Sequence, residues 1–295
     1  MSLLNSLKGT GVALVTPFKS NFEVDFDSLG KVIDYVIDGG AEYVITLGTT
    51  GEPVTLNRDE KLAVVKFTFQ AVEKRVPVVV GIGGNNTREV LKDIETFPLY
   101  DASAILHASP YYNRPSQEGI FQHYKSVSQA SPLPIIIYNV PSRTGSNILA
   151  DTTLRLANEC SKIGGIKEAS GSMLQCMNIL QKRPVDFLVV SGDDQLTLPL
   201  IACGMDGVIS VCANSFPKIF SAMVRCALKD DFNEARKLHY KLLQANELLF
   251  AENNPAGVKA VLYEMGLIEN VLRLPLVPLS KCYHKKIKEL MPLFS

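Results

Sequence analysis

The sequence contains no tryptophan and only four histidines, and its six cysteines include no C-x-x-C pair. Because these residues are dispersed, they do not have the spacing of metal ligands, and we expect no metal site. In a chain of this length we expect the cysteines to be reduced, mostly buried thiols, which is typical of a cytoplasmic protein.

Net charge is also lacking, since 30 Lys and Arg balance 30 Asp and Glu in 295 residues. The clustered positive charge required for binding nucleic acid or an anionic membrane is therefore not expected. No apolar run approaches the roughly 18 residues that a membrane span needs. Residues 1–18 lack the basic segment and long apolar stretch of a signal peptide. These absences predict a cytoplasmic globular protein without a nucleic-acid or membrane partner.

What the sequence does contain is a repeated alternation of short apolar runs and helical stretches. The runs are Val12–Val15, Tyr43–Leu47, Val76–Val80, Ser103–Leu106, Ile135–Tyr138, Ile163–Lys167, Phe187–Val190 and Gly207–Val211. Short, nearly all-apolar runs are typical of parallel strands covered on both faces. From the second run onward they begin roughly 20 to 35 residues apart, the length of a βα repeat.

Amphipathic stretches fill the gaps between the runs. They include Asp27–Asp38, Arg58–Glu73 with Asn57 as its N-cap, Gln117–Ala130 and Ala150–Cys160. Eight such repeats favour a closed (β/α)₈ TIM barrel over an open doubly wound sheet. The turn Gly81–Gly84 lacks the G-x-G-x-x-G spacing that an open dinucleotide-binding sheet would need after its first strand.

The alternation stops after the eighth run. Asp231–Glu252 is a long amphipathic helix with no strand behind it, and Pro255–Met265 and Lys281–Leu290 have helical patterns. We therefore predict an α/β fold with a catalytic barrel over residues 1–224 and a C-terminal helical domain over residues 225–295.

Lys167 is the most informative candidate at the strand ends, where a barrel enzyme builds its active site. By strand alternation, Gly165, Lys167 and Ala169 share a face, and small neighbours leave room around the amine. If that face is the barrel interior, partial desolvation favours the neutral, nucleophilic amine, which can form a Schiff base with a carbonyl. The alternative is a strand-end lysine that reaches solvent or pairs with a carboxylate.

Tyr138 ends the neighbouring run, so its phenol is expected near Lys167 and could move protons during Schiff-base formation. The alternative is a core tyrosine whose hydroxyl is bound by backbone. Thr49 and Thr50 lie in a glycine-flanked turn that presents hydroxyl and backbone N–H groups to an anion, although ordinary turn chemistry explains them equally well. Arg143 fits bidentate carboxylate binding, unless it is simply a surface arginine.

Two further pairs leave alternatives open. Tyr111 and Tyr112 are adjacent, which most often means loop packing, but one hydroxyl could continue a proton relay from Thr50. Asp193 and Asp194 follow the seventh run without a third ligand at a useful spacing, so hydrogen bonding or capping is favoured over metal binding.

Six motifs together carry a resemblance that extends over essentially the whole chain. They are GTTGE at 48–52, PYYNRPSQEG at 110–119, YNVPSRTG at 138–145, GIKEAS at 165–170, SGDD at 191–194 and GVISV at 207–211. With these motifs the chain resembles the dihydrodipicolinate synthase/N-acetylneuraminate lyase family of pyruvate-dependent class I aldolases. Thr49 and Arg143 are similar to the synthase branch of that family.

The resemblance implies condensation of pyruvate with L-aspartate-4-semialdehyde to 4-hydroxy-tetrahydrodipicolinate, toward diaminopimelate and lysine. It implies a Schiff base on Lys167, with no metal or organic cofactor, and Tyr138 as general acid/base. Thr50 would link Tyr138 to a Tyr112 supplied across a subunit interface, which implies an obligate dimer and a homotetramer built as a dimer of dimers. Pyruvate would be held by Thr49, Thr50 and the backbone near Gly192 and Ile209, and Arg143 would bind the semialdehyde carboxylate.

Departures from the family pattern concern a regulatory lysine site. Asn85, Glu89 and Tyr111 match the polar set of lysine-inhibited relatives, but Arg58 and Lys61 stand where those relatives have histidines. Because Lys61 would repel a bound lysine ammonium, we expect weak or absent feedback inhibition.

Rival hypotheses remain. One is a sibling pyruvate aldolase, such as an N-acetylneuraminate lyase or a 2-keto-3-deoxy sugar-acid aldolase, against which Thr49 and Arg143 argue. Another is a barrel that has lost catalysis and only binds a ligand. It would predict a broken relay, but Lys167 and the relay residues Tyr138, Thr50 and Tyr112 are all present.

Overall fold

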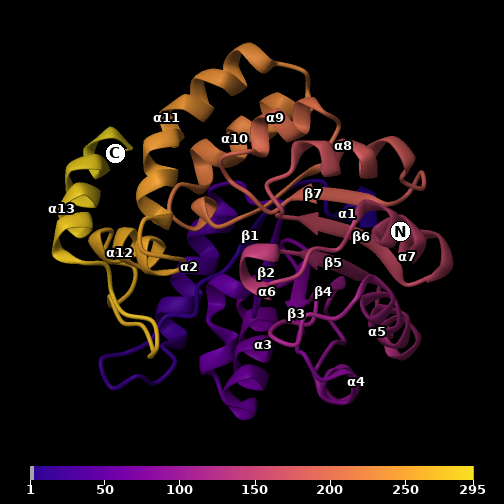
Figure 1. Ribbon diagram of the computed structural model, residues 1–295. Helices are drawn as coiled ribbons and strands as arrows, with labels where there is room; N and C mark the ends of the chain where they lie inside the picture. The colour runs from indigo at the N-terminus through magenta and orange to yellow at the C-terminus, as the bar shows by residue number, and fades with distance from the viewer. Residues whose placement is uncertain (1–2, 295) are drawn as a thin grey trace.

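Eight parallel strands close into a barrel in the computed structural model, which describes residues 3–294 (Figure 1). Each strand pairs with the next along the chain, and the last pairs with the first. The strands are β1 (Gly9–Ala13), β2 (Tyr43–Thr46), β3 (Val78–Gly81), β4 (Ala104–Ala108), β5 (Ile135–Asn139), β6 (Ile163–Glu168), β7 (Leu188–Ser191) and β8 (Gly207–Ser210). The predicted TIM barrel is confirmed.

Helices alternate with the strands, and four of them, over residues 26–38, 58–72, 117–130 and 150–159, lie where the hydrophobic periodicity predicts. The helices are α1 (Leu3–Ser6), α2 (Phe26–Asp38), α3 (Arg58–Val72), α4 (Thr87–Thr96), α5 (Gln117–Ala130), α6 (Pro141–Thr144), α7 (Ala150–Glu159), α8 (Met173–Lys182), α9 (Thr197–Ala202) and α10 (Pro217–Leu228). Three short 3₁₀ turns, η1 (Thr49–Gly51), η2 (Pro53–Thr55) and η3 (Cys212–Asn214), lie after strand ends. Asn57 caps α3 as predicted, because its side chain accepts from the backbone N–H of Glu60 while the Glu60 side chain accepts from that of Asn57.

The first strand begins earlier than predicted, at Gly9 rather than Val12. Gly9 and Gly11 have no apolar side chain to mark a strand, yet packing inside the barrel requires a glycine here. A Cβ at position 11 would lie 2.2 Å from Cε2 of Tyr43. The Tyr43 ring fills the barrel interior at this level, and its hydroxyl donates to the Val208 carbonyl at 3.2 Å.

One end of the barrel is closed by the N-terminal segment. Leu3 and Leu7 are buried against the interior cluster of barrel side chains. Leu3 lies against Gly164 near the start of β6, so α1 covers the N-terminal ends of the strands. The C-terminal ends of the strands are therefore left for a binding site.

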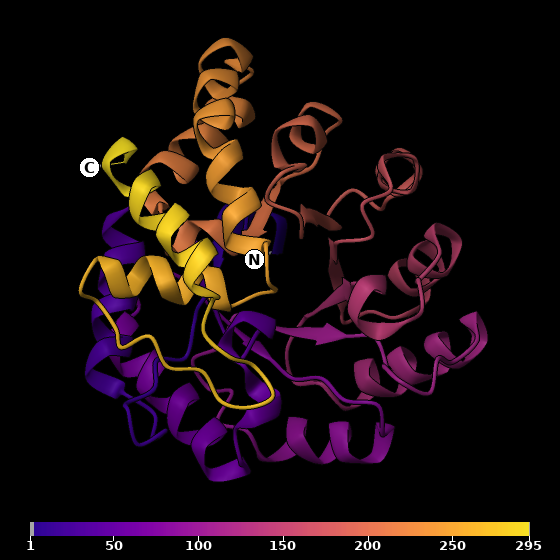
Figure 2. The same ribbon diagram turned by 60° about the vertical axis from the view of Figure 1, so that its left-hand side comes forward.

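The C-terminal helices gather on one side of the barrel, next to α2 and α10 (Figures 1 and 2). They are α11 (Phe232–Phe250), α12 (Ala256–Glu264) and α13 (Lys281–Leu290), followed by the 3₁₀ turn η4 (Met291–Leu293). The segment between α12 and α13, yellow in Figure 2, extends back toward the first part of the chain. The domain boundary at 224/225 stays a prediction, and α10 runs continuously across it.

All six cysteines are free, but the expectation that most are buried is only half right. Cys160, Cys176 and Cys212 are buried and Cys226 is half-buried, whereas Cys203 and Cys282 are exposed. Of the helices within residues 3–294, none combines the length and the apolarity needed to cross a bilayer.

Candidate active site

Lys167 and Tyr138 are direct neighbours across the barrel sheet, where β5 and β6 pair in parallel with Tyr138 opposite Lys167. The Lys167 Nζ lies over the Tyr138 ring, 4.3 Å from its centroid. Both side chains are buried, with 4% of Lys167 and 7% of Tyr138 exposed. The amine is therefore buried in the barrel end and does not reach solvent, so the face that Lys167 shares with Gly165 and Ala169 is not the solvent-facing alternative.

The next residue pair along these strands faces the other way. Asn139 lies opposite Glu168, and its side-chain amide donates to both carboxylate oxygens, at 3.1 and 2.9 Å. Glu168 also accepts from Gln175 Nε2 at 2.9 Å and from the backbone N–H of Ser170 at 2.7 Å. Asn139 Oδ1 in turn accepts from the backbone N–H of Ile148. This buried network fixes the ends of β5 and β6, and with them the positions of Tyr138 and Lys167.

A glycine shapes the space around the amine, but it is not the predicted Gly165 on β6. A Cβ at Gly165 would lie 2.7 Å from the Leu188 carbonyl oxygen, so Gly165 makes room for β7 and not for the amine. Gly192 is the glycine that faces the lysine, since a Cβ there would lie 2.9 Å from Lys167 Cε. The backbone N–H of Gly192 donates to the Glu168 carbonyl at 2.8 Å. Ile209 is a buried side chain of the barrel interior.

Thr49 and Thr50 form η1 immediately after β2, in a turn with left-handed backbone on both sides. Leu47 has φ 56° and Glu52 has φ 52°, conformations that non-glycine residues adopt only when surrounding contacts enforce them. Thr16 Oγ1 donates to the Gly51 carbonyl at 2.7 Å. The Thr50 hydroxyl is buried and accepts from Asn254 Nδ2 at 3.1 Å. The turn is thus held in one conformation at the barrel mouth.

A cavity of about 480 Å³ opens at this end of the barrel. Its lining brings together Thr49, Tyr138 and Arg143 from the predicted site. Arg143 lies on the short helix α6, exposed at the mouth, and its guanidinium donates to Asn253 Oδ1 at 3.1 Å. Lys167, Thr50, Gly192 and Ile209 are not part of this lining, and the Lys167 amine lies behind the Tyr138 ring that lines the cavity. A phenol next to a buried amine, a turn hydroxyl and a guanidinium at the rim form an arrangement suited to a small oxo-acid.

Tyr111 and Tyr112 behave differently from each other. Tyr111 is 39% exposed and lines the cavity. Tyr112 is 89% exposed, and its backbone has a left-handed φ of 73°. Its exposure in this single chain is compatible with the predicted relay across a subunit interface, and that relay stays a prediction.

The residues predicted for a regulatory lysine site do not all line the same cavity. Tyr111 and Lys61 line the cavity, whereas Asn85 and Glu89 are not part of its lining. Arg58 forms an ion pair with Asp93 at 3.0 Å.

Asp193 and Asp194 accept backbone hydrogen bonds, as favoured from the sequence. Asp193 Oδ1 accepts from Gln195 and Leu196, and the buried Asp194 accepts from Val211 and Cys212 at 3.0 and 2.9 Å. Burial raises the pKa of Asp194. Residues 3–294 contain no group of three or more His, Cys, Asp or Glu side chains placed to hold a metal ion.

Sequence reasoning missed the residues that support this site from a distance. Asn139 and Glu168 were noted only as parts of motifs, and Asn254 lies in a segment predicted to be a helical appendage. The signal for the first two was their place directly after Tyr138 and Lys167, since adjacent strand residues point to opposite faces. Asn254 gave no such signal, because its contact with Thr50 spans 204 positions.

Comparison with known proteins decides the family. Residues 6–292 match the dihydrodipicolinate synthetase family. The chain belongs to this family. A relative from Flavobacterium psychrophilum, named 4-hydroxy-tetrahydrodipicolinate synthase, is 52% identical over 273 residues, which cover 92% of this chain and 93% of that relative.

Solved structures of the dihydrodipicolinate synthetase family have the same fold over nearly the whole chain. The dihydrodipicolinate synthase from Acinetobacter baumannii, described as chloride-inhibited and complexed with pyruvate, superposes with a TM-score of 0.94 at 39% identity and covers 98% of this chain and 99% of its own. A monomeric dihydrodipicolinate synthase variant has a TM-score of 0.96 at 39% identity, covering 99% of this chain and 98% of its own.

Proposed function

We propose that this chain condenses pyruvate with L-aspartate-4-semialdehyde to 4-hydroxy-tetrahydrodipicolinate, through a Schiff base on Lys167. The observation that carries the proposal is the buried Lys167 amine, 4.3 Å from the Tyr138 ring centroid at the C-terminal end of the barrel. Membership of the family supports the reaction, since relatives over nearly the full length carry the name of this activity.

The first half of the reaction forms an enamine. The Lys167 amine attacks C2 of pyruvate, and the former carbonyl oxygen takes up protons and leaves as water. Tyr138 is the general acid/base for these transfers because its phenol is the hydroxyl next to the amine on the neighbouring strand. Loss of a proton from C3 of the imine then gives a carbon nucleophile.

The second half joins the two substrates. C3 of the enamine attacks the aldehyde carbon of the semialdehyde, and the resulting alkoxide takes up a proton. The amino group of the semialdehyde then attacks the imine carbon and displaces Lys167, so that ring closure releases the product. The reaction needs no metal or organic cofactor, because the imine on Lys167 is the electron sink.

Each substrate carboxylate has a separate proposed binding group. Thr49 and Thr50, with the backbone near Gly192 and Ile209, bind the pyruvate carboxylate through hydroxyl and N–H donors. Arg143 binds the semialdehyde carboxylate at the cavity rim, where its guanidinium is accessible.

The test of the covalent step is borohydride reduction with pyruvate, followed by peptide mass mapping. We expect a reduced pyruvyl adduct on the Lys167 peptide and none in Lys167→Ala. Lys162→Ala is the matched control, since this lysine directly precedes β6, at the opposite end of the strand from Lys167, and its amine donates to the Pro132 carbonyl at 3.2 Å. An adduct on another lysine, or one that persists in Lys167→Ala, would refute the mechanism.

Substrate choice needs a second assay. Turnover with L-aspartate-4-semialdehyde should exceed cleavage of N-acetylneuraminate or a 2-keto-3-deoxy sugar acid by orders of magnitude. Preferential cleavage of one of those acids would favour a sibling aldolase, which also forms the adduct.

A homo-oligomer, a tetramer built as a dimer of dimers, is part of the proposal. Tyr112 is 89% exposed, and α8 presents Leu174 and Met177 with 66% and 43% of their surfaces exposed. Leu174 and Met177 lie one turn apart on α8, so they expose apolar surface on the same side of the helix, where a subunit could bind. Sedimentation velocity tests the assembly, and Tyr112→Phe should lower kcat if the partner subunit completes the relay. We also propose a cytoplasmic enzyme, for which the six free cysteines are the support.

A further inference from the structure

A fully buried ion pair joins the C-terminal helices to the threonine turn. Lys259 Nζ on α12 lies 2.5 Å from Glu52 Oε1, and both side chains are 0% exposed. Glu52 directly follows η1, so it is the residue that ends the Thr49–Gly51 turn. Burial is costly for both charges, which is why such pairs persist only with close geometry and further contacts.

Lys259 makes further contacts of the kind that a buried ion pair needs. Its ammonium donates to the Val271 carbonyl at 3.0 Å and lies 4.2 Å from the centroid of the Phe18 ring. Burial lowers the pKa of Lys259 to about 8, against the opposing effect of the Glu52 carboxylate. The amine is therefore surrounded by the Val271 carbonyl, the Phe18 ring and the Glu52 carboxylate, and the carboxylate is the partner that favours its charged form.

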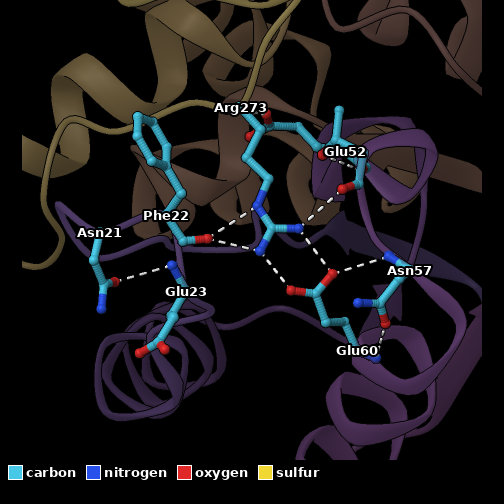
Figure 3. Close-up of polar contacts among 8 residues, drawn as sticks. Asn21, Phe22, Glu23, Glu52, Asn57, Glu60 and Arg273 are labelled. Atoms are coloured by element: carbon cyan, nitrogen blue, oxygen red, sulfur yellow. Dashed lines mark hydrogen bonds and ion pairs between the residues drawn. The ribbon is translucent and has the colours of Figure 1, made fainter.

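Arg273 fixes the same region from the segment after α12 (Figure 3). Its guanidinium contacts both oxygens of Glu60, at 2.8 and 2.5 Å, and two of its nitrogens donate to the Phe22 carbonyl. Its backbone N–H donates to Glu52 Oε2 at 3.4 Å. Each oxygen of Glu52 therefore faces a group supplied by the C-terminal segment.

These contacts converge on a turn whose backbone is strained. Glu52 has a left-handed φ of 52°, and it precedes a proline that begins η2. The neighbouring Thr50 hydroxyl accepts from Asn254, which lies in the segment just before α12. Surroundings that over-determine such a conformation are typical of functional sites, where strain maintains a fixed geometry.

We propose that Lys259 is a positioning residue for the proposed pyruvate-binding turn, acting through its ion pair with Glu52. The inference rests on the proposed function, because it assigns Thr49 and Thr50 to the pyruvate carboxylate. Lys259 itself does not touch substrate. By holding Glu52, it keeps the hydroxyl and N–H groups of the turn aimed at the barrel mouth, so that the carboxylate meets a preformed site.

The test compares a double variant, Glu52→Gln/Lys259→Met, with the single variant Lys259→Met. Lys259→Met leaves Glu52 as an unpaired buried charge and is expected to destabilise the fold, whereas the double variant removes both charges at similar volume. His284→Gln is the control, because its 2.6 Å contact with Glu264 lies within the C-terminal helices and away from the turn. Melting temperature, hydrogen–deuterium exchange of the 47–57 peptide and steady-state kinetics are measured for each.

We expect the double variant to melt near the wild type, to exchange faster in the 47–57 peptide, and to raise KM for pyruvate roughly tenfold or more. KM for the semialdehyde should change less, because Arg143 is untouched. His284→Gln should match the wild type in exchange at the turn and in both KM values. A double variant that folds with unchanged turn exchange, or with KM for pyruvate within twofold of wild type, overturns the inference.

Failure of the proposed function would be visible separately. A wild type that forms no borohydride-trapped pyruvate adduct refutes that function without reference to either variant, and it overturns the pyruvate part of the inference with it. The exchange comparison would then still decide whether Lys259 holds the turn.

Discussion

Gly192 limits how the Lys167 side chain can lie. A Cβ at position 192 would be 2.9 Å from Lys167 Cε and 2.7 Å from Ala169 Cβ. Because the lysine chain is flexible, Gly192→Ala should displace the amine rather than unfold the barrel, at about 1–3 kcal/mol of stability. We expect borohydride-trapped adduct formation to slow by roughly 10- to 100-fold.

Gly30→Ala is the control for that substitution. The added Cβ would lie 3.6 Å from the Phe67 ring, an ordinary contact, and the position is helical. It should leave the rate of adduct formation unchanged. A Gly192→Ala enzyme that forms the adduct at the wild-type rate would contradict this prediction, because it would show that the Lys167 side chain can accommodate a Cβ at position 192.

Lys61 is the residue for which we expect an altered response to lysine. It lines the cavity together with Tyr111, so an ammonium bound there would meet a like charge. Initial rates should show weak or no inhibition by lysine, and Lys61→Gln should increase inhibition several-fold. Lys66→Gln, an exposed lysine on the same helix, should not. Strong inhibition of the wild type at sub-millimolar lysine would contradict this prediction.

The limits of sequence reasoning are clearest among such single residues. The proximity of Tyr138 and Lys167 was predictable because each stands at the end of one of two neighbouring runs, and alternation with a period of two assigns Lys167 to a face without saying whether that face is inward. The same alternation assigned the space around the amine to Gly165 and Ala169, but it is Gly192 that faces the lysine, next to Ala169. Which glycine faces which side chain depends on the stagger between strands, and a run of apolar letters does not encode that stagger.

The ends of β5 and β6 depend on one buried carboxylate. Glu168 accepts from Asn139, Gln175 and the backbone of Ser170, so Glu168→Leu would leave several buried donors unpaired. We expect a loss of about 3–5 kcal/mol in the free energy of unfolding, measured by urea denaturation. Glu168→Gln, which keeps one acceptor oxygen, should lose less.

Glu159 provides the comparison for Glu168. It pairs with Arg155 at 3.2 Å on the surface of α7, with 53% of its side chain exposed. Glu159→Gln should change stability by about 0.5 kcal/mol or less. Equal losses at positions 159 and 168 would contradict the role given to the buried network.

At the scale of elements, prediction from the sequence was most accurate for helices with a clear amphipathic pattern or an N-terminal cap. The bounds of α5 and α13 are those expected, and Asn57 begins α3 through a capping box. The predicted bounds were wrong where tertiary packing decides where a strand begins, as at β1, in which Gly11 makes room for the Tyr43 ring. The contact of Asn254, just before α12, with Thr50 had no local signal, because the two residues are 204 positions apart and no periodic pattern links them.

For the molecule as a whole, a buried histidine pair predicts sensitivity to acid. His107 Nε2 lies 2.7 Å from His123 Nε2, His107 Nδ1 lies 2.5 Å from the Ile82 carbonyl, and His123 Nδ1 lies 2.8 Å from Thr87 Oγ1. Since the carbonyl only accepts, His107 donates through Nδ1 and accepts from His123 through Nε2. The chain of hydrogen bonds joins the residue after β3 to β4, α5 and α4. Every ring nitrogen has a partner when both rings are neutral, whereas two protonated rings would bring two N–H groups face to face at Nε2.

The sign of the pH dependence follows from the lowered pKa values of this pair. Burial lowers the pKa of His107 to about 3 and that of His123 to about 4, from an ordinary 6.5. Between pH 6.5 and about 4 the two histidines therefore bind protons in the unfolded chain but stay neutral in the native protein. Because the unfolded state binds more protons, the free energy of unfolding falls as the pH falls. The loss is at most about 1.4 kcal/mol per pH unit for each histidine. Above pH 6.5 both histidines are neutral in the native and the unfolded state, so they do not change the free energy of unfolding with pH.

A double variant, His107→Gln/His123→Gln, separates this effect from the titration of carboxylates such as Glu60, whose pKa the Arg273 guanidinium lowers. Both chains keep those carboxylates, so their common contribution cancels when urea denaturation is compared from pH 7 to pH 4.5. The variant should be less stable at pH 7, because the hydrogen-bond chain is altered, but its stability should fall less steeply with acid. Parallel slopes would mean that the native pair accepts protons as readily as unfolded histidines do, which the burial and the fixed tautomers of both rings argue against.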